Sequence, residues 1–79
     1  MKNIDRDKRE CHAEFGEFIR SVRLKEGLYQ SDLAAKLDVS QTLISMIEKG
    51  ERDVDLSDAM KICKSLNVDL RDFLDLYNK

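Results

Sequence analysis

Apolar residues recur along the chain at the spacing of a buried helical stripe, first in the segment that precedes Gly27. Four of them stand at positions i, i+3, i+4 and i+7, and so share one side of a helix: Phe15, Phe18, Ile19 and Val22. This spacing predicts a helix over about residues 11–26. Gly27 is well suited to end it, because glycine adopts a left-handed backbone without strain.

Two short helices are predicted next, over about residues 30–37 and 41–49. The apolar residues of each again gather on one side: Leu33, Ala34 and Leu37 in the first, Leu43, Ile44 and Ile47 in the second. Ser40 is a favourable N-cap for the second helix, and Gly50 a favourable terminator. Between the two, Asp38 stands where a left-handed residue is needed, a conformation that Asp tolerates better than most residues.

Two more helices are predicted over about residues 56–66 and 70–77. An Asp precedes each, with another Asp three residues later, a pattern typical of helix N-termini: Asp55 with Asp58, and Asp69 with Asp72. The first of these helices is expected to bury Leu56, Ala59, Met60, Cys63 and Leu66. The last carries Phe73, Leu74 and Tyr77.

The fold class that follows is all-α, a compact five-helix bundle over residues 11–79. The chain has 79 residues, no proline and 42% hydrophobic residues, enough for one small core, and no alternating strand pattern competes with the helices. Residues 1–10, MKNIDRDKRE, are almost wholly charged and polar. They are expected to form either a frayed polar arm or a helical extension.

The net charge, the cysteines and the single histidine limit the classes of function that are open to this protein. A net charge of −2 argues against indiscriminate polyanion binding, which needs a pronounced basic patch. Two cysteines, no signal peptide and no apolar run that could span a membrane indicate a cytoplasmic protein. Cys63 is expected to be a buried small hydrophobe, and the adjacent Cys11 and His12 lack a second pair at ligand spacing, so no metal or cofactor is predicted.

The helix over residues 41–49 has an unusual polar face. Ordinary solvated faces carry Glu and Lys, whereas this one presents Gln41, Thr42, Ser45, Met46 and Lys49. Amide and hydroxyl groups supply both donors and acceptors. Two short helices joined by a tight turn, the second with such a face, have the layout of a helix-turn-helix.

Residues 27–52, GLYQSDLAAKLDVSQTLISMIEKGER, resemble the Cro and phage-repressor (XRE) family of helix-turn-helix DNA-binding proteins. The matching positions are Gly27, Leu28, Gln30, Asp32, Leu33, Ala34, Leu37, Val39, Ser40, Ile44, Ser45, Ile47, Glu48, Lys49 and Gly50. Tyr29, Asp38 and Met46 depart from the pattern. The resemblance covers about residues 15–74.

The resemblance implies roles for individual residues in binding double-stranded DNA. In the major groove, Gln41, Thr42, Ser45 and Met46 are the candidate base readers, since amide and hydroxyl groups match the hydrogen-bonding pattern of base edges. The candidate phosphate contacts are Gln30, Ser40, Lys49 and Arg52, for which simple solvation of Lys49 and Arg52 is the alternative. Arg23 and Glu48 resemble the family's structural ion pair.

A sequence-specific transcriptional regulator that acts as a homodimer is the leading prediction. Phe73, Leu74 and Tyr77 are the candidate dimer contact, with ordinary core packing as the alternative. The competing function is a protein-interaction module, such as the antitoxin of a toxin–antitoxin pair. No small-molecule ligand is predicted, and no enzyme, because no nucleophile has a base at meaningful spacing and no glycine-rich phosphate loop occurs.

Overall fold

The computed structural model describes the backbone of residues 7–77 and the side-chain surroundings of residues 11–76. It contains five helices and, within this part of the chain, no strand: α1 (Asp7–Lys25), α2 (Gln30–Leu37), α3 (Gln41–Glu48), α4 (Leu56–Ser65) and α5 (Leu70–Tyr77). The predicted all-α five-helix fold is therefore confirmed. Helix α1 starts at Asp7, earlier than the predicted residue 11, so residues 7–10 extend the helix, while residues 1–6 of the predicted arm lie outside the described residues.

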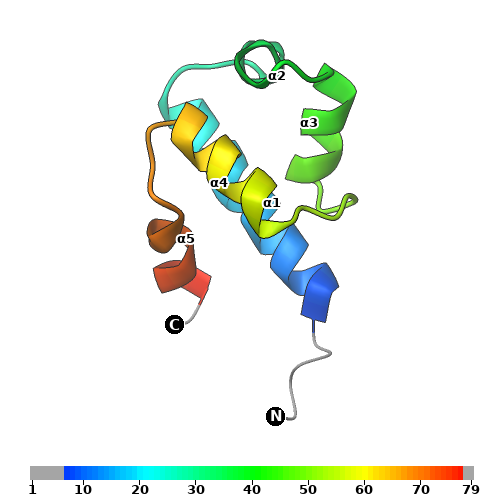
Figure 1. Ribbon diagram of the computed structural model, residues 1–79, viewed down its shortest axis with the longest axis vertical. Coiled ribbons are helices and arrows are strands. Elements are labelled where there is room, and N and C mark those ends of the chain that lie inside the picture. The colour runs from blue at the N-terminus through cyan, green and yellow to red at the C-terminus, as the bar shows by residue number, and fades with distance from the viewer. Residues whose placement is uncertain (1–6, 78–79) are drawn as a thin grey trace.

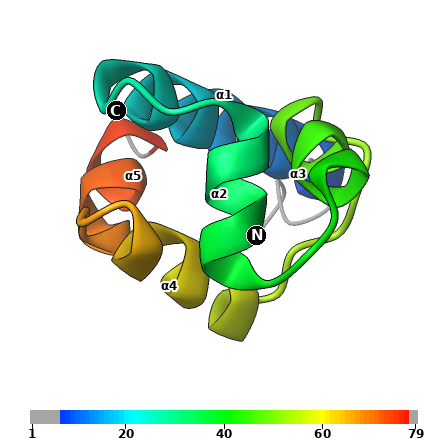
Figure 2. The same cartoon turned by 90° about the horizontal axis from the view of Figure 1, so that it is seen from above.

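Helix α2 lies near the C-terminal end of the longer α1, and α3 lies alongside α1 (Figure 1). Helix α1 packs against α3 and α5, while α4 packs against α2 and α5. Seen from both directions, α3 and α5 occupy opposite sides of the molecule, with α1 and α2 between them (Figure 2). The surfaces presented by α3 and α5 therefore face away from each other.

The core is built from the predicted stripes of all five helices. Ile19, Leu33, Ile44, Cys63 and Leu66 are its most completely buried large side chains. An aromatic cluster fastens α5 to α1, because the Phe73 ring meets Phe15 edge-on at a centroid distance of 5.2 Å and Phe18 at 5.5 Å. Such aromatic contacts add to the hydrophobic stabilisation.

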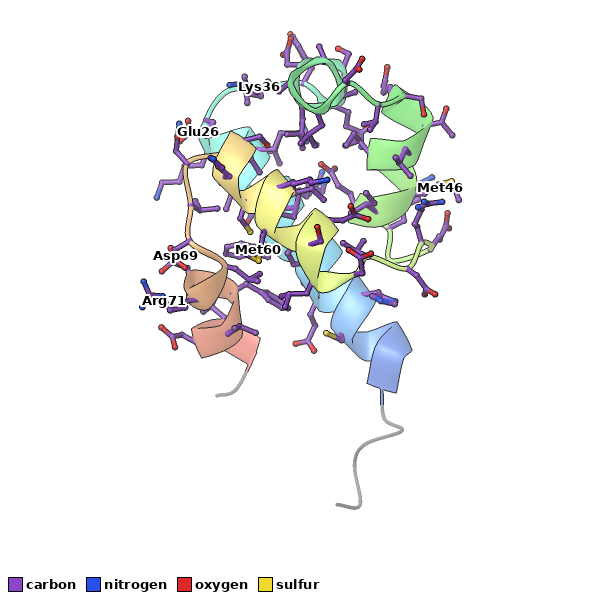
Figure 3. All side chains as sticks on the ribbon, viewed as in Figure 1. Glu26, Lys36, Met46, Met60, Asp69 and Arg71 are labelled. Atoms are coloured by element: carbon purple, nitrogen blue, oxygen red, sulfur yellow. The ribbon has the colours of Figure 1, made fainter. Side chains whose placement is uncertain are left out.

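The predicted burial of Leu56 and Met60 is wrong. Leu56 is 67% exposed and Met60 is 56% exposed, whereas Ile62 is buried at 4%. The reason is the rotation of α4, which turns Ala59, Ile62, Cys63 and Leu66 toward the core at i, i+3, i+4 and i+7. Leu56 and Met60 instead border an open groove between α4 and α5, and Met60 is marked in Figure 3.

Four helices end in the same way, on a residue with a positive φ angle. These residues are Gly27 (φ 73°), Asp38 (φ 57°), Gly50 (φ 74°) and Asn67 (φ 60°), so the left-handed conformation predicted for Asp38 is confirmed. At each end, the N–H of the left-handed residue donates to a carbonyl three residues back, and the next N–H donates to one five residues back. This is the Schellman arrangement, which satisfies carbonyls that the helix leaves free.

Side chains satisfy the N–H groups at the helix starts. The Ser40 hydroxyl accepts from the Leu43 N–H at 3.1 Å, and the Asp55 carboxylate accepts from the Asp58 N–H at 2.8 Å, which confirms these two predicted N-caps. At the start of α5, the Asp69 carboxylate accepts from the Arg71 N–H at 2.9 Å. Tyr29 makes no side-chain cap bond; its own N–H donates to the Asp32 carboxylate at 2.7 Å. These caps fix where the two helices of the candidate site begin.

Candidate nucleic-acid interface

The outer side of α3 brings the four predicted base-reading residues onto one surface, here called the reading face: Gln41, Thr42, Ser45 and Met46. Gln41 and Thr42 are exposed, Ser45 is half-buried, and Met46 is 36% exposed. Met46 lies on the outward side of α3 (Figure 3). The opposite side of α3 buries Ile44 and Ile47 in the core. The sequence therefore sorts α3 into a packed side and a free polar side.

An ion pair buried between α1 and α3 holds the end of the reading helix. The Arg23 Nε donates to Glu48 Oε2 at 2.7 Å, and Arg23 Nη2 donates to Glu48 Oε1 at 3.0 Å. Arg23 and Glu48 are only 6% and 8% exposed, and the hydrogen bonds to Glu48 raise the pKa of Arg23. The predicted structural ion pair is confirmed. A further bond, from Arg23 Nη1 to the Leu28 carbonyl at 2.8 Å, ties in the chain before α2.

Gln30 joins the same network from the start of α2. Its Nε2 donates to Glu48 Oε1 at 3.0 Å. An amide nitrogen carries two hydrogens, so one can bond Glu48 while the other is free to meet a phosphate. The local pattern around Gln30 gave no sign of this link, because Glu48 lies 18 residues further along the chain.

The other candidate phosphate contacts surround the ends of α3. The Ser40 hydroxyl accepts a bond from α3 and keeps its own hydrogen as a donor. Lys49 and Arg52 are exposed at the far end. Arg52 borders a shallow hollow together with Met46, Glu51 and Asp53. The two neighbouring acidic residues weaken the local positive potential there.

The candidate dimer contact divides between core and surface. Phe73 is 5% exposed and belongs to the aromatic cluster with Phe15 and Phe18, so it supports the monomer core and offers almost no surface to a second copy. Leu74 is 42% exposed, and Leu76, which was not among the predicted contact residues, is 56% exposed. The side chain of Tyr77 lies outside the described residues.

The remaining candidate groups have ordinary surroundings. His12 Nδ1 lies 3.5 Å from Asp53 Oδ1. Cys63 is buried, as predicted, and burial is the main cause that raises the pKa of its thiol to about 11, with smaller effects from Asp69 and Asp72. The residues that the structure describes hold no group of three or more His, Cys, Asp or Glu side chains that could bind a metal ion. None of their helices is long and apolar enough to cross a membrane.

Helices α2 and α3, their tight turn through Asp38 and the reading face define a helix-turn-helix of the DNA-binding type. A family model described as "Helix-turn-helix" matches residues 19–73. The chain belongs to this family of DNA-binding transcriptional regulators, in its Cro and phage-repressor (XRE) branch.

Two curated relatives share much of the sequence. The control protein C.BamHI of Bacillus amyloliquefaciens is 44% identical over 62 residues, which cover 77% of this chain and 76% of the relative. An HTH-type transcriptional regulator of Methanocaldococcus jannaschii is 43% identical over 54 residues, which cover 68% of this chain and 82% of the relative.

Solved structures of similar proteins share the fold. The restriction-modification controller protein C.AhdI from Aeromonas hydrophila superposes with a TM-score of 0.72 at 28% identity, over 77% of this chain and 92% of that one. The controller protein C.Esp1396I, crystallised as a tetramer with its natural 35 base-pair operator, superposes with a TM-score of 0.74 at 30% identity, over 84% of this chain and 87% of that one.

Proposed function

We propose that this protein is a sequence-specific regulator of transcription in the cytoplasm, that it binds double-stranded DNA as a homodimer, and that α3 reads the major groove. By analogy with the controller proteins that it resembles, we further propose that it regulates genes of a restriction-modification system. The observation that carries the proposal is the reading face, an exposed surface of amide and hydroxyl groups on a helix that Arg23 and Gln30 hold through Glu48. A helix held in this way can present hydrogen-bonding groups to base edges without first becoming ordered.

Each residue of the reading face has a chemically matched base edge. The Gln41 amide can bond adenine through its donor and acceptor together, and the Thr42 and Ser45 hydroxyls can bond either kind of edge. Met46 offers an apolar contact for the methyl group of thymine. Gln30, Ser40, Lys49 and Arg52 would position the helix by contacts to phosphates.

The location of α3 supports a homodimer built through the opposite side of the molecule. Exposed apolar residues of α4 and α5, here called the α4–α5 face, are Leu56, Met60, Leu74 and Leu76. Leu56 and Met60 border the groove between α4 and α5, and Leu76 borders a hollow between α5 and α1. The molecule measures 22 Å along the horizontal direction of Figure 1, which separates α3 from α5. Two copies joined through α5 would carry their reading helices near the two outer edges of the dimer, as binding to two half-sites about 34–36 Å apart requires.

The proposal is tested on a duplex obtained by selection from random sequence with the wild-type protein. Gln41→Ala should weaken binding to the selected duplex by about 1–3 kcal/mol and relax discrimination at one base pair per half-site. Arg52→Ala should weaken binding to selected and scrambled duplexes alike, and should reduce the salt slope by about one unit for each phosphate that Arg52 neutralises.

Lys64→Ala is the matched control, because Lys64 is an exposed cation on α4, away from α3. It should leave both the affinity and the salt slope of the selected duplex unchanged. If the wild type enriches no sequence, or Gln41→Ala affects all duplexes equally, the reading face does not read DNA. A protein-interaction module would then be the better account.

A further inference from the structure

We propose that Gly16 is a positioning residue for DNA reading, because its missing side chain lets α1 lie directly against the backbone at the end of α3. The inference rests on the proposed function and adds a residue that contacts no DNA. Gly16 is buried inside α1. A β-carbon built on it would lie 2.3 Å from the Ile47 carbonyl oxygen and 2.7 Å from the Glu48 carbonyl oxygen.

Backbone geometry gives no other reason for a glycine at this position. Gly16 is in the interior of a regular helix, and the glycines with positive φ angles in the described residues are Gly27 and Gly50. Glycine is less favourable than alanine inside a helix. The close contact with α3 is the feature of the structure that requires a residue without a side chain.

A second close contact lies one helical turn earlier on α1. A β-carbon on Gly50 would lie 2.7 Å from the Ala13 α-carbon and 3.0 Å from the Ala13 nitrogen. Ala13 and Gly16 thus bear on the chain at both sides of Lys49, where α3 ends. Both contacts involve backbone atoms, of Ile47 and Glu48 in one and of Ala13 in the other. A change of side-chain rotamer therefore cannot relieve them.

The Arg23–Glu48 ion pair makes the contact between Gly16 and the end of α3 sensitive to small changes in the size of residue 16. Glu48 meets α1 twice, since its carbonyl lies against Gly16 and its carboxylate is bonded by Arg23. A methyl group at position 16 would need about 1 Å more space to reach ordinary van der Waals separation from the Ile47 oxygen. Helix α3 must then shift or tilt, and the reading face moves with it.

Such a shift affects base contacts and phosphate contacts differently. Hydrogen bonds to base edges depend on distances within a few tenths of an ångström, whereas the attraction of cations to phosphates changes gradually with distance. Displacement of α3 should therefore reduce the preference for the selected sequence more than it reduces binding to DNA in general. A residue that served only stability would not change this preference in the folded protein.

The experiment compares Gly16→Ala with Ala59→Gly, which also exchanges one methyl group inside a helix but lies on α4, a helix that packs against α2 and α5. Both variants are measured at a temperature where circular dichroism shows them fully folded. The probes are the duplex selected by the wild type and a scrambled duplex of the same composition. Gly16→Ala should lower the ratio of the two affinities about tenfold, and Ala59→Gly should keep the wild-type ratio. A folded Gly16→Ala variant with the wild-type ratio would overturn the inference.

If Gly16→Ala does not fold, Ala13→Val tests the neighbouring contact of α1 with Gly50, because Ala13 is exposed and a larger side chain there disturbs folding less. It should lower the affinity ratio about threefold by pressing on Gly50, and an unchanged ratio would count against the inference. A wild type that shows no sequence preference would sink the proposed function instead. In that case, the NMR amide resonances of residues 41–49 still test whether a methyl group at position 16 displaces α3. Gly16→Ala should shift these resonances throughout α3, and unchanged resonances would refute the displacement.

Discussion

The α3 side and the α5 side of the molecule are held in opposite ways. At the end of α3, the buried Glu48 carboxylate has hydrogen-bond donors from both α1 and α2, in Arg23 and Gln30. On α5, Phe73 anchors the helix in the core while Leu74 and Leu76 stay exposed. A single copy therefore positions its reading helix by its own contacts but leaves the α4–α5 face uncovered. Contacts within one copy fix the position of α3, whereas we expect a second copy to cover the α4–α5 face.

The largest expected effect is on the α3 side, from Arg23→Ala. This change leaves the Glu48 carboxylate buried without its cationic partner, which should lower the free energy of unfolding by about 3–5 kcal/mol. Denaturant unfolding measures it. Arg71→Ala is the control, since Arg71 pairs with Asp69 on the exposed surface of α5 and its loss should leave stability almost unchanged. A small effect of Arg23→Ala would mean that water reaches Glu48 readily.

On the α5 side, Leu74→Asp should act on association rather than on folding. Full burial of a leucine contributes about 1.5–3 kcal/mol. Because Leu74 is 42% exposed in one copy, each copy would lose roughly half of that contribution, and the new carboxylate would also lose hydration at the interface. Sedimentation should show a dimer for the wild type at micromolar concentration and a monomer of unchanged melting temperature for Leu74→Asp. Met46→Asp places the same charge on α3 and should leave the dimer intact. A wild type that is monomeric both free and on DNA would contradict the proposed use of this face.

Gln30→Ala should have a smaller effect on stability. It removes only the hydrogen bond from α2 to Glu48 and leaves the ion pair with Arg23 of α1 in place. A hydrogen bond to a charged group contributes about 1.5–3 kcal/mol, and the partial exposure of Gln30 places the expected loss of stability at about 1.5 kcal/mol. DNA affinity should also fall, because the same amide is a candidate phosphate donor. Ser31→Ala, at the exposed neighbouring position on α2, should change neither quantity. If Gln30→Ala alters affinity alone, its bond to Glu48 adds nothing to folding.

No effect at neutral pH is expected from the last feature, a pH dependence of stability that originates in the core. Burial raises the pKa of the Cys63 thiol from 9.0 to about 11, so the folded protein holds this proton more tightly than the unfolded chain does. The resulting stabilisation is present in full below pH 9 and is lost as the pH rises toward 11. The stability difference between wild type and Cys63→Ala should therefore shrink over that interval in denaturant unfolding. A difference that stays constant from pH 8 to pH 11 would show that the thiol ionises without cost.

The features that the sequence predicted correctly depend on neighbours within a few residues. The caps at Ser40 and Asp55, the left-handed Asp38 and the two faces of α3 all follow from local hydrogen bonding and helical periodicity. The Arg23–Glu48 pair spans 25 residues and was predicted only through the resemblance to a family.

The features that the sequence did not reveal depend on how the helices meet. The exposure of Leu56 and Met60 follows from the rotation of α4 in the assembled bundle, which periodicity alone does not fix when apolar residues occupy more than one side. The bond from Gln30 to Glu48 and the contact of Gly16 with Ile47 join separate helices. No pattern within one helix contains them.

The repeated left-handed ends of the helices bear on how quickly this chain folds. Each of the stops at Gly27, Asp38, Gly50 and Asn67 is closed by bonds that span at most five residues, so a helix boundary can form before distant segments have met. Helical proteins dominated by such local contacts fold within microseconds to milliseconds. Two of the four stops use Asp and Asn rather than glycine, and a glycine there would remove the strain of a left-handed β-carbon. Asp38→Gly should therefore slow unfolding more than it speeds folding if the turn between α2 and α3 forms after the transition state. The ratio of the two rate changes would show whether the helix-turn-helix is already formed in that state.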